Sequence, residues 1–310
     1  MEPTGPNKLC FKEAKIEVTV TVFIDKRKEI IVSLTESMFK NFKNRANKFH
    51  LIWIGLLCML FSCNKSEQYP DVQIFGHAGM GVNMAYSIYH NNSEEAIDLA
   101  LSLPNIDGVE MDIRMSKDGT LWLFHDSRLE FSTNGSGCFD ELTDQEIEQF
   151  HYKSPYKERL VRLETILTKL KDGQTFILDI KHWNGCAQPY SDMVRFKDAL
   201  LAIPDSLKNK LIIDSSYPHW LSSISQVYKV VFSTLSYEAG LSKLQEIPTL
   251  YGLMMRSKDM SADQISNIKS LGKTVFLYEM RSSKMQRATM KKAPTAILSD
   301  DPRGALIIRD

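Results

Sequence analysis

The 310-residue chain lacks a net charge, because 38 basic residues balance 38 acidic ones. A general nucleic-acid-binding protein normally carries a basic excess or a basic face, so we expect no nucleic-acid partner. Cysteine is scarce, and five in 310 residues are too few for a disulfide scaffold. No stretch is apolar over the ~20 residues that a membrane-spanning helix needs, and no long internal repeat is present. Apolar residues make up 43% and charged residues 25%, which is typical of a globular protein.

One apolar run without charged residues, Leu51 to Ser62, stands out before the main body of the chain. It is short for a membrane span but has the length of the hydrophobic region of a signal peptide. Four basic residues precede it, as in such peptides: Lys40, Lys43, Arg45 and Lys48. The run ends in Leu60-Phe61-Ser62-Cys63, which resembles a bacterial lipobox with an unusually bulky Phe61. The alternative interpretation of the run is a buried core helix.

These features predict four segments. We expect residues 1–37 to be a mis-called start or an extension, 38–62 a lipoprotein signal peptide, 63–70 a linker after the lipidated Cys63, and 71–310 the folded domain. The expected location is the bacterial cell envelope, either the periplasm or the outer surface, with a membrane anchor through Cys63. Cys138 and Cys186 remain after processing. A disulfide is permitted outside the cytosol, but the sequence leaves open whether they meet.

Residues 70–310 alternate between short β-rich runs and helical runs, which indicates a parallel sheet with helices outside it. About eight such units in this length favour an α/β fold of the (β/α)8 TIM-barrel type. A doubly wound open sheet is the alternative, weakened by the lack of a G-x-G-x-x-G motif after the first strand. The predicted strands are Val72–His77, Gly108–Arg114, Thr120–His125, Thr175–Lys181, Lys210–Asp214, Lys229–Thr234, Leu250–Met255, Thr274–Tyr278 and Thr295–Leu298.

Polar side chains gather where four of these strands end. Alternation along a strand places carboxylates and a basic residue on one face in two of them. In a barrel, the carboxyl ends of the strands carry the active site. The residues concerned are His77, then Glu110, Asp112 and Arg114, then His125, then Asp179 and Lys181.

Their chemistry is consistent with cleavage of a phosphodiester. Three carboxylates, from Glu110, Asp112 and Asp179, suit one divalent cation, Mg²⁺ or Ca²⁺, better than Zn²⁺. His77 and His125 can serve as a general acid and a general base near neutral pH. Lys181 and Arg114 can hold a phosphate. Taken singly, each of these residues also fits a solvated strand face or a polar loop.

Several segments resemble the glycerophosphodiester phosphodiesterases, a TIM-barrel family related to the phosphatidylinositol-specific phospholipases C. The resemblance covers roughly residues 72–303 and implies a small insertion after the second strand, matched by residues 133–137 and 142–143. Gly76-His77-Ala78-Gly79 stands where the family has H-R-G, and 107–119 match D-G-x-E-x-D-V-x-x-T-K-D-G. The remaining matches are 123–126 to the second histidine motif, 163–167 to L-E-E-V-L, 178–181 to E-I-K and 297–302 to T-D-x-P. The match at 123–126 implies a hairpin turn at Asp118-Gly119 between this strand and the one before it.

The resemblance implies metal-dependent hydrolysis of glycerophosphodiesters to glycerol 3-phosphate and an alcohol, with small phosphodiesters as the ligands. His77 is then the base and His125 the acid, with the reverse order left open. The family's arginine is replaced by Ala78, so we expect Arg114 or Arg256 to take over its contact with phosphate. Tyr278 and Glu279, at the end of a late strand, are expected to line the headgroup pocket, although a core tyrosine and a rim glutamate fit as well.

Two other functions remain open. The first is a phospholipase C- or D-like lipase of the same fold that acts on intact or lyso-phospholipids. The second is a phosphodiester-binding protein that has lost turnover with the arginine replaced by Ala78.

Overall fold

The computed structural model describes residues 22–24, 30–32 and 68–310, except 83–86, 184–185 and 187–190. The chain divides into two units, residues 1–66 and 67–310. In the first, β1 (Val22–Ile24) and β2 (Ile30–Val32) form an antiparallel pair. The predicted signal peptide and the lipidated Cys63 lie outside the described residues. Among the helices that are described, none has the length and apolar character needed to cross a membrane.

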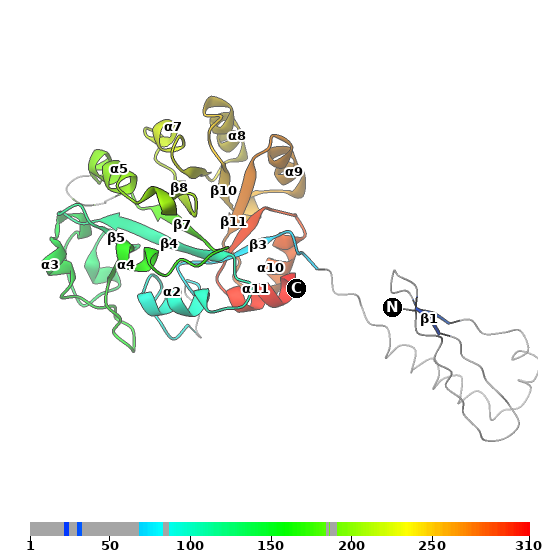
Figure 1. Ribbon diagram of the computed structural model, residues 1–310, viewed down its shortest axis with the longest axis horizontal. Coiled ribbons are helices and arrows are strands. Elements are labelled where there is room, and N and C mark those ends of the chain that lie inside the picture. Colours follow the sequence, from blue (N-terminus) through cyan, green and yellow to red (C-terminus); the bar gives the residue numbers. More distant parts are fainter. Residues whose placement is uncertain (1–21, 25–29, 33–67, 83–86, 184–185, 187–190) are drawn as a thin grey trace, which may run out of the picture. The chain divides into compact units, whose positions relative to one another are not determined.

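Eight parallel strands of the second unit form a closed barrel, which confirms the predicted (β/α)8 fold (Figure 1). The ring closes because the first strand pairs with both the second and the last. In chain order the strands are β3 (Gln73–Gly76), β4 (Gly108–Met115), β7 (Thr175–Ile180), β8 (Leu211–Ser215), β9 (Lys229–Ser233), β10 (Gly252–Arg256), β11 (Thr274–Tyr278) and β12 (Ala296–Ser299).

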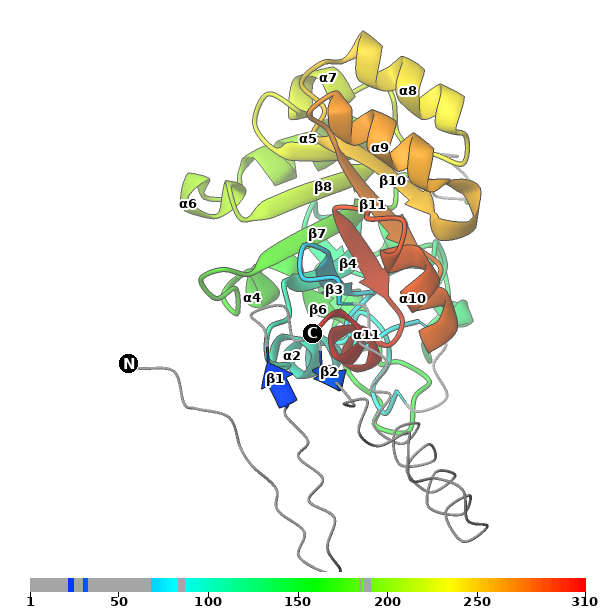
Figure 2. The ribbon, with the colours of Figure 1, turned by 90° about the vertical axis from the view of Figure 1, so that its right-hand side faces the viewer.

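Helices lie outside the strands, as Figure 2 shows from a second direction. Ser93 caps the first by accepting a hydrogen bond from the Ala96 N–H, as expected for a serine in that position. The helices around the barrel are α2 (Glu94–Leu101), α5 (Met193–Leu201), α6 (Asp205–Lys208), α7 (Leu221–Ile224), α8 (Tyr237–Glu246), α9 (Ala262–Ser270), α10 (Ser283–Met290) and α11 (Pro302–Arg309).

The predicted strand Thr120–His125 is not part of the barrel. Its central residues form β5 (Leu121–Leu123), which runs antiparallel to the carboxyl half of β4. The physical reason is the connection: a tight turn at Asp118-Gly119, with Gly119 at φ +93°, joins the strands, whereas a parallel neighbour needs a long crossover. The hairpin brings His125 back toward the carboxyl end of the barrel.

The segment after β5 is the insertion expected after the second barrel strand. It contains two 3-10 turns, a short helix and one more strand before the chain returns to the barrel through α4. A small core of its own, including Trp122, Phe124 and Tyr152, stabilises it. The elements are η2 (Leu129–Phe131), η3 (Phe139–Glu141), α3 (Asp144–Ile147), β6 (Val161–Arg162) and α4 (Leu163–Leu167).

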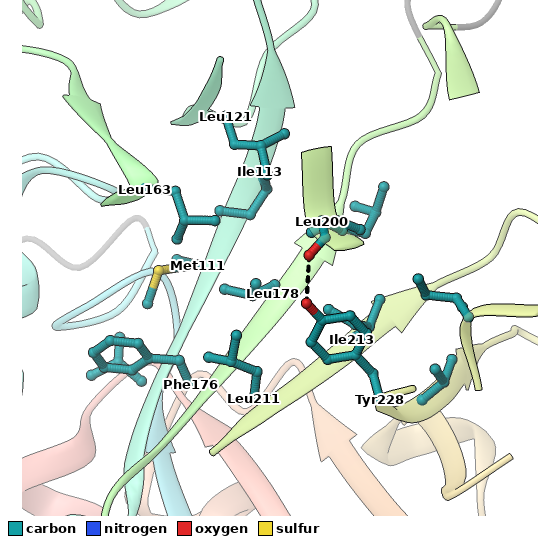
Figure 3. Close-up of a cluster of buried hydrophobic side chains, with 14 of the residues drawn as sticks. Met111, Ile113, Leu121, Leu163, Phe176, Leu178, Leu200, Leu211, Ile213 and Tyr228 are labelled. Carbon is teal, nitrogen blue, oxygen red and sulfur yellow. Dashed lines mark hydrogen bonds between the residues drawn. The ribbon is translucent and has the colours of Figure 1, made fainter. Parts of the chain in front are cut away.

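The strands bury apolar side chains on both faces, which places the core. Outward-facing residues such as Met111 and Leu178 pack against the helices, and this layer also holds the hydrogen bond from Tyr228 to the Leu200 carbonyl (Figure 3). Inward-facing residues such as Ile177 and Phe276 fill the barrel. Because strand residues alternate between the faces, the charged residues beyond this inner layer point into the mouth of the barrel.

Candidate active site

A cavity of about 630 Å³ opens at the carboxyl ends of the strands. Most of the predicted site residues line it, and they come from four strands and the loop after β5. The lining residues predicted from the sequence are His77, Glu110, Asp112, Arg114, His125, Asp179, Lys181 and Tyr278. Arg256 and Glu279 are not among the lining residues. Arg256 forms ion pairs with Asp259 and Glu279 outside the cavity, so the structure does not bring Arg256 and Glu279 into the site.

Glu110, Asp112 and Asp179 converge in this cavity, with one oxygen of each within 4.8 Å of the others. Glu110 and Asp112 lie two residues apart on β4, and Asp179 is the register partner of Asp112 on β7. Glu110 and Asp112 are almost completely buried. Burial and the charge of Asp112 raise the pKa of Glu110. The raised pKa means that the charged form of Glu110 is disfavoured without a nearby cation. Three convergent carboxylates of this kind fit a hard divalent cation such as Mg²⁺ or Ca²⁺.

Lys181 neutralises part of this cluster. Its Nζ lies 2.8 Å from Asp112 Oδ1 and 2.6 Å from Asp179 Oδ2. Burial alone would raise the pKa of Asp112, but Lys181, together with His125 and the hydrogen bond from Asn92, outweighs it and holds that pKa well below its usual range. Asp112 is therefore a carboxylate throughout the physiological pH range.

Asn92 fixes the orientation of Asp112, a role that the sequence did not reveal. Its side-chain amide donates to Asp112 Oδ2 at 2.6 Å, and its carbonyl oxygen accepts from the Asp112 N–H at 3.0 Å. Asn92 is buried and adopts φ +61°, a conformation that asparagine tolerates better than most residues. The sequence signal was an asparagine just before the Ser93 cap, which by itself reads as a turn residue.

Asp300 orients His77 and was also missed. The Asp300 carboxylate lies 2.8 Å from His77 Nδ1, which directs Nε2 toward Glu110, 3.9 Å away. Burial alone would lower the pKa of His77, but Asp300 and Glu110 raise it to about 9. The loop after β3 packs closely around this pair: a Cβ on Gly81, at φ +109°, would lie only 1.9 Å from the Asp300 carbonyl oxygen.

His125 stands at the cavity mouth and is much more exposed, at 57% of its side chain. A hydrogen bond of 3.0 Å joins His125 Nδ1 and Asp126 Oδ1. An aspartate therefore orients each of the two histidines, His77 and His125. That hydrogen bond and the charge of Asp112 raise the pKa of His125. Each histidine thus presents one ring nitrogen to the cavity while a carboxylate holds the other.

Ala78, which replaces the arginine of the family motif, contributes through its backbone. Its N–H donates to Glu110 Oε2 at 2.9 Å, and the residue is fully buried at φ +47°. This contact does not depend on the side chain, so it is retained with alanine. The structure therefore shows how Glu110 is held, but places no cationic side chain at this position.

Arg114 braces the loops around the cavity. Its guanidinium donates to the carbonyl oxygens of His125 at 3.2 Å, Lys181 at 3.4 Å and Trp183 at 3.1 Å. Asp140 of the insertion lies 3.7 Å away. These contacts join the loops that carry His125 and Lys181. They occupy the guanidinium of Arg114, for which the sequence predicted a contact with phosphate.

A disulfide between Cys138 and Cys186 joins the insertion to the loop after β7, two parts of the chain that Arg114 also connects. Cys138 belongs to the insertion and Cys186 to the loop after β7. The bond answers the pairing question that the sequence left open. Together with Arg114, it limits how far the insertion can move from the barrel.

Comparisons with known proteins agree with this geometry. The model of the glycerophosphoryl diester phosphodiesterase family matches residues 77–303. A glycerophosphodiester phosphodiesterase of Caldanaerobacter subterraneus subsp. tengcongensis is 22% identical over 74% of this chain and 94% of its own. YhdW of Bacillus subtilis is 30% identical over 29% of this chain, and the match spans only 39% of that relative's length.

Solved structures share the fold. An Oleispira antarctica phosphodiesterase, determined in complex with the product sn-glycerol-3-phosphate, has a TM-score of 0.64 at 19% identity. The match covers 76% of this chain and 96% of that one. With the family model matched across the barrel and both histidines and all three carboxylates lining one cavity, the chain belongs to the glycerophosphoryl diester phosphodiesterase family.

Proposed function

We propose that this protein hydrolyses glycerophosphodiesters to glycerol 3-phosphate and an alcohol. The observation that carries the proposal is the cavity in which two carboxylate-oriented histidines and Lys181 surround three convergent carboxylates. The carboxylates of Glu110, Asp112 and Asp179 would hold one divalent cation. When bound, such an ion polarises a phosphoryl oxygen and lowers the pKa of a bound hydroxyl.

The chain's own residues then supply the proton transfers. Asp300 and Glu110 raise the pKa of His77 to about 9, and a cation held by Glu110 would offset the charge of that carboxylate and favour the neutral imidazole. In its neutral form His77 Nε2 accepts the proton of a glycerol hydroxyl as that oxygen attacks phosphorus, while Asp300 stabilises the imidazolium. His125 donates a proton to the leaving alcohol as its bond to phosphorus breaks, and a cyclic phosphate remains. Water then opens the ring with the histidines in exchanged roles. The ammonium of Lys181 stabilises negative charge that develops on the phosphoryl oxygens.

Replacement of either histidine tests this assignment. We expect His77→Ala and His125→Ala each to lower kcat by ~10²-fold or more, the usual contribution of a general acid or base. His151→Ala is the matched control, because His151 belongs to the insertion and does not line the cavity. Near-complete activity of His77→Ala in a folded, metal-supplied protein would contradict the mechanism.

Hydrolysis of intact or lyso-phospholipids is a second candidate. It is favoured by two large aromatic residues of the cavity rim, Phe131 and Trp183, which are 66% and 56% exposed. Exposed aromatic side chains suit contact with acyl chains or a membrane surface. A comparison of turnover on phosphatidylcholine, lysophosphatidylcholine and glycerophosphocholine separates the two activities. Tight binding of all three without product would instead support a binding protein.

We also propose that the protein is an exported lipoprotein anchored through Cys63. The Cys138–Cys186 disulfide supports export, because such bonds persist in oxidising compartments. Expression of the full chain in a bacterial host tests this. The anchor predicts partition into the detergent phase and loss of that partition in Cys63→Ala. Unchanged partition of Cys63→Ala would contradict the proposed anchor.

A further inference from the structure

One buried carboxyl of the cavity has no part in the proposed chemistry. Asp214, on β8, lies directly across the sheet from Asp179, which itself pairs with Asp112. The three aspartates thus form a row across adjacent strands. Asp214 is only 4% exposed and lines the cavity, but it is not in the group of carboxylates whose oxygens converge.

Ser233 of the next strand holds this carboxyl in place. Its hydroxyl donates to Asp214 Oδ1 at 2.5 Å. Each carboxyl oxygen has two lone pairs, so Asp214 can form further hydrogen bonds beyond that one. A buried carboxyl is strongly destabilised unless such bonds are made, and on the cavity side the partner is a bound molecule or solvent.

We infer that Asp214 and Ser233 form a subsite for a free hydroxyl group of the substrate's glycerol part. The inference rests on the proposed function and deepens it. The row of aspartates places Asp214 one strand beyond the carboxylate cluster. In the proposed subsite, the glycerol part of a diester bound at the cluster extends toward Asp214. The subsite makes deacylated glycerophosphodiesters, with their free terminal hydroxyl, the preferred substrates.

The chemistry of this wall favours a hydroxyl over a cationic headgroup. Among the lining residues, Ser216 and Ser233 carry small hydroxyl side chains close to Asp214, and Tyr278 supplies a single aromatic ring, whose pKa is raised by burial and by the nearby charge of Asp214. Recognition of a quaternary ammonium normally uses several aromatic faces. A hydroxyl, in contrast, is small and can both donate to and accept from a carboxyl.

Acylation of the terminal hydroxyl removes its proton and adds bulk. Sites built to hydrogen-bond a substrate hydroxyl reject analogues that lack it by up to ~10⁴–10⁵-fold, because buried polar groups are left without partners. With one carboxyl and one serine, we expect discrimination of about 10²-fold in kcat/KM.

The test compares two substrates on the full-length, metal-supplied protein. The first is sn-glycero-3-phosphocholine, and the second is its 1-deoxy analogue, which keeps the 2-hydroxyl needed for attack but lacks the terminal one. Wild type should prefer the first by about 10²-fold. Asp214→Ala should abolish this preference by lowering kcat/KM for the first substrate while changing that for the analogue less than threefold.

Three variants separate recognition from a structural effect. Asp214→Asn keeps hydrogen-bonding capacity and should retain most of the preference, and Ser233→Ala carries the test if Asp214→Ala fails to fold. Ser233→Ala should lower the preference partially, because it releases Asp214. Ser225→Ala is the matched control: Ser225 bonds Thr249 below the amino end of β9 and does not line the cavity, so its kinetics should be unchanged.

Equal turnover of both substrates by wild type, or an equal loss on both substrates in Asp214→Ala, would overturn the inference. A change in headgroup preference instead of hydroxyl preference would assign Asp214 to the headgroup and overturn it too. Turnover of neither diester would count against the proposed function alone. Calorimetric binding of glycerol 3-phosphate and its 1-deoxy analogue then decides the inference: tighter binding of the former that depends on Asp214 supports it, and equal binding overturns it.

Discussion

Replacement of Asp300 by asparagine isolates the group that orients His77. The wild-type carboxylate lies 2.8 Å from His77 Nδ1, and its side chain is 7% exposed. Asparagine has nearly the same shape but no charge. It therefore removes the charge-assisted part of the hydrogen bond and allows the amide to face the ring in either orientation.

The magnitude follows from this one contact. Hydrogen bonds to charged groups contribute about 1.5–3 kcal/mol. If the contact between Asp300 and the imidazolium of His77 is made fully only as the proton arrives, its loss lowers kcat by about 10- to 150-fold. KM should change less than threefold, because Asp300 does not line the cavity and so does not touch the substrate.

The pH dependence of kcat is a second measurement. A purely structural effect would lower kcat without shifting the pH at which it changes. Asp300 contributes to the raised pKa of His77, so Asp300→Asn should shift the limb assigned to His77 toward lower pH. The matched control is Asp301→Asn. Asp301 caps α11 by accepting from the Gly304 N–H, and asparagine caps equally well.

The assay is steady-state release of glycerol 3-phosphate by wild type, Asp300→Asn and Asp301→Asn at saturating metal. The reasoning is refuted if Asp300→Asn keeps wild-type kcat and the same pH profile while its thermal unfolding is unchanged. It is also refuted if Asp301→Asn shows the same loss, because the effect would then belong to the loop and not to His77.

Three further predictions concern the loops and the buried charges. Arg114→Met should lower the free energy of unfolding by about 1–3 kcal/mol in urea and lower kcat; unchanged kinetics would contradict its bracing role. Cys138→Ser with Cys186→Ser should cost about 2–4 kcal/mol in non-reducing urea, and reductant should abolish the difference from wild type. With EDTA, the Tm should fall from pH 6.5 to about 9, because His77 and Glu110 with raised pKa values hold protons that the unfolded chain releases; a rising Tm would contradict this.

Much of the barrel could be predicted from the sequence because its signals are local. Alternating β-rich and helical runs predicted all eight barrel strands, and the serine cap of α2 was visible at Ser93. Period-two alternation in β4 placed Glu110 and Asp112 on one face, where the structure has them. The run Thr120–His125 was predicted as a further strand after a hairpin turn at Asp118-Gly119, and the structure confirms this antiparallel pairing with β4.

The supporting residues could not be predicted because their partners are distant in sequence. Asp300 reaches His77 across 223 residues, through the closure of the barrel by β12 and β3. Arg114 was expected to bind phosphate from its strand face alone, and the carbonyl oxygens that engage it became visible only in three dimensions. Asp214 lies in a strand that reads as a buried apolar run with one acidic residue at its end.

A metal-dependent turnover assay on the full-length protein tests the central claim most directly. Glycerophosphocholine, glycerophosphoethanolamine and glycerophosphoinositol are offered with Mg²⁺, with Ca²⁺ or with EDTA, and glycerol 3-phosphate is measured. The account predicts release from at least one diester, abolished by EDTA and restored by the cation. A folded, metal-supplied protein that releases glycerol 3-phosphate from none of the three, or that is unaffected by EDTA, would contradict it.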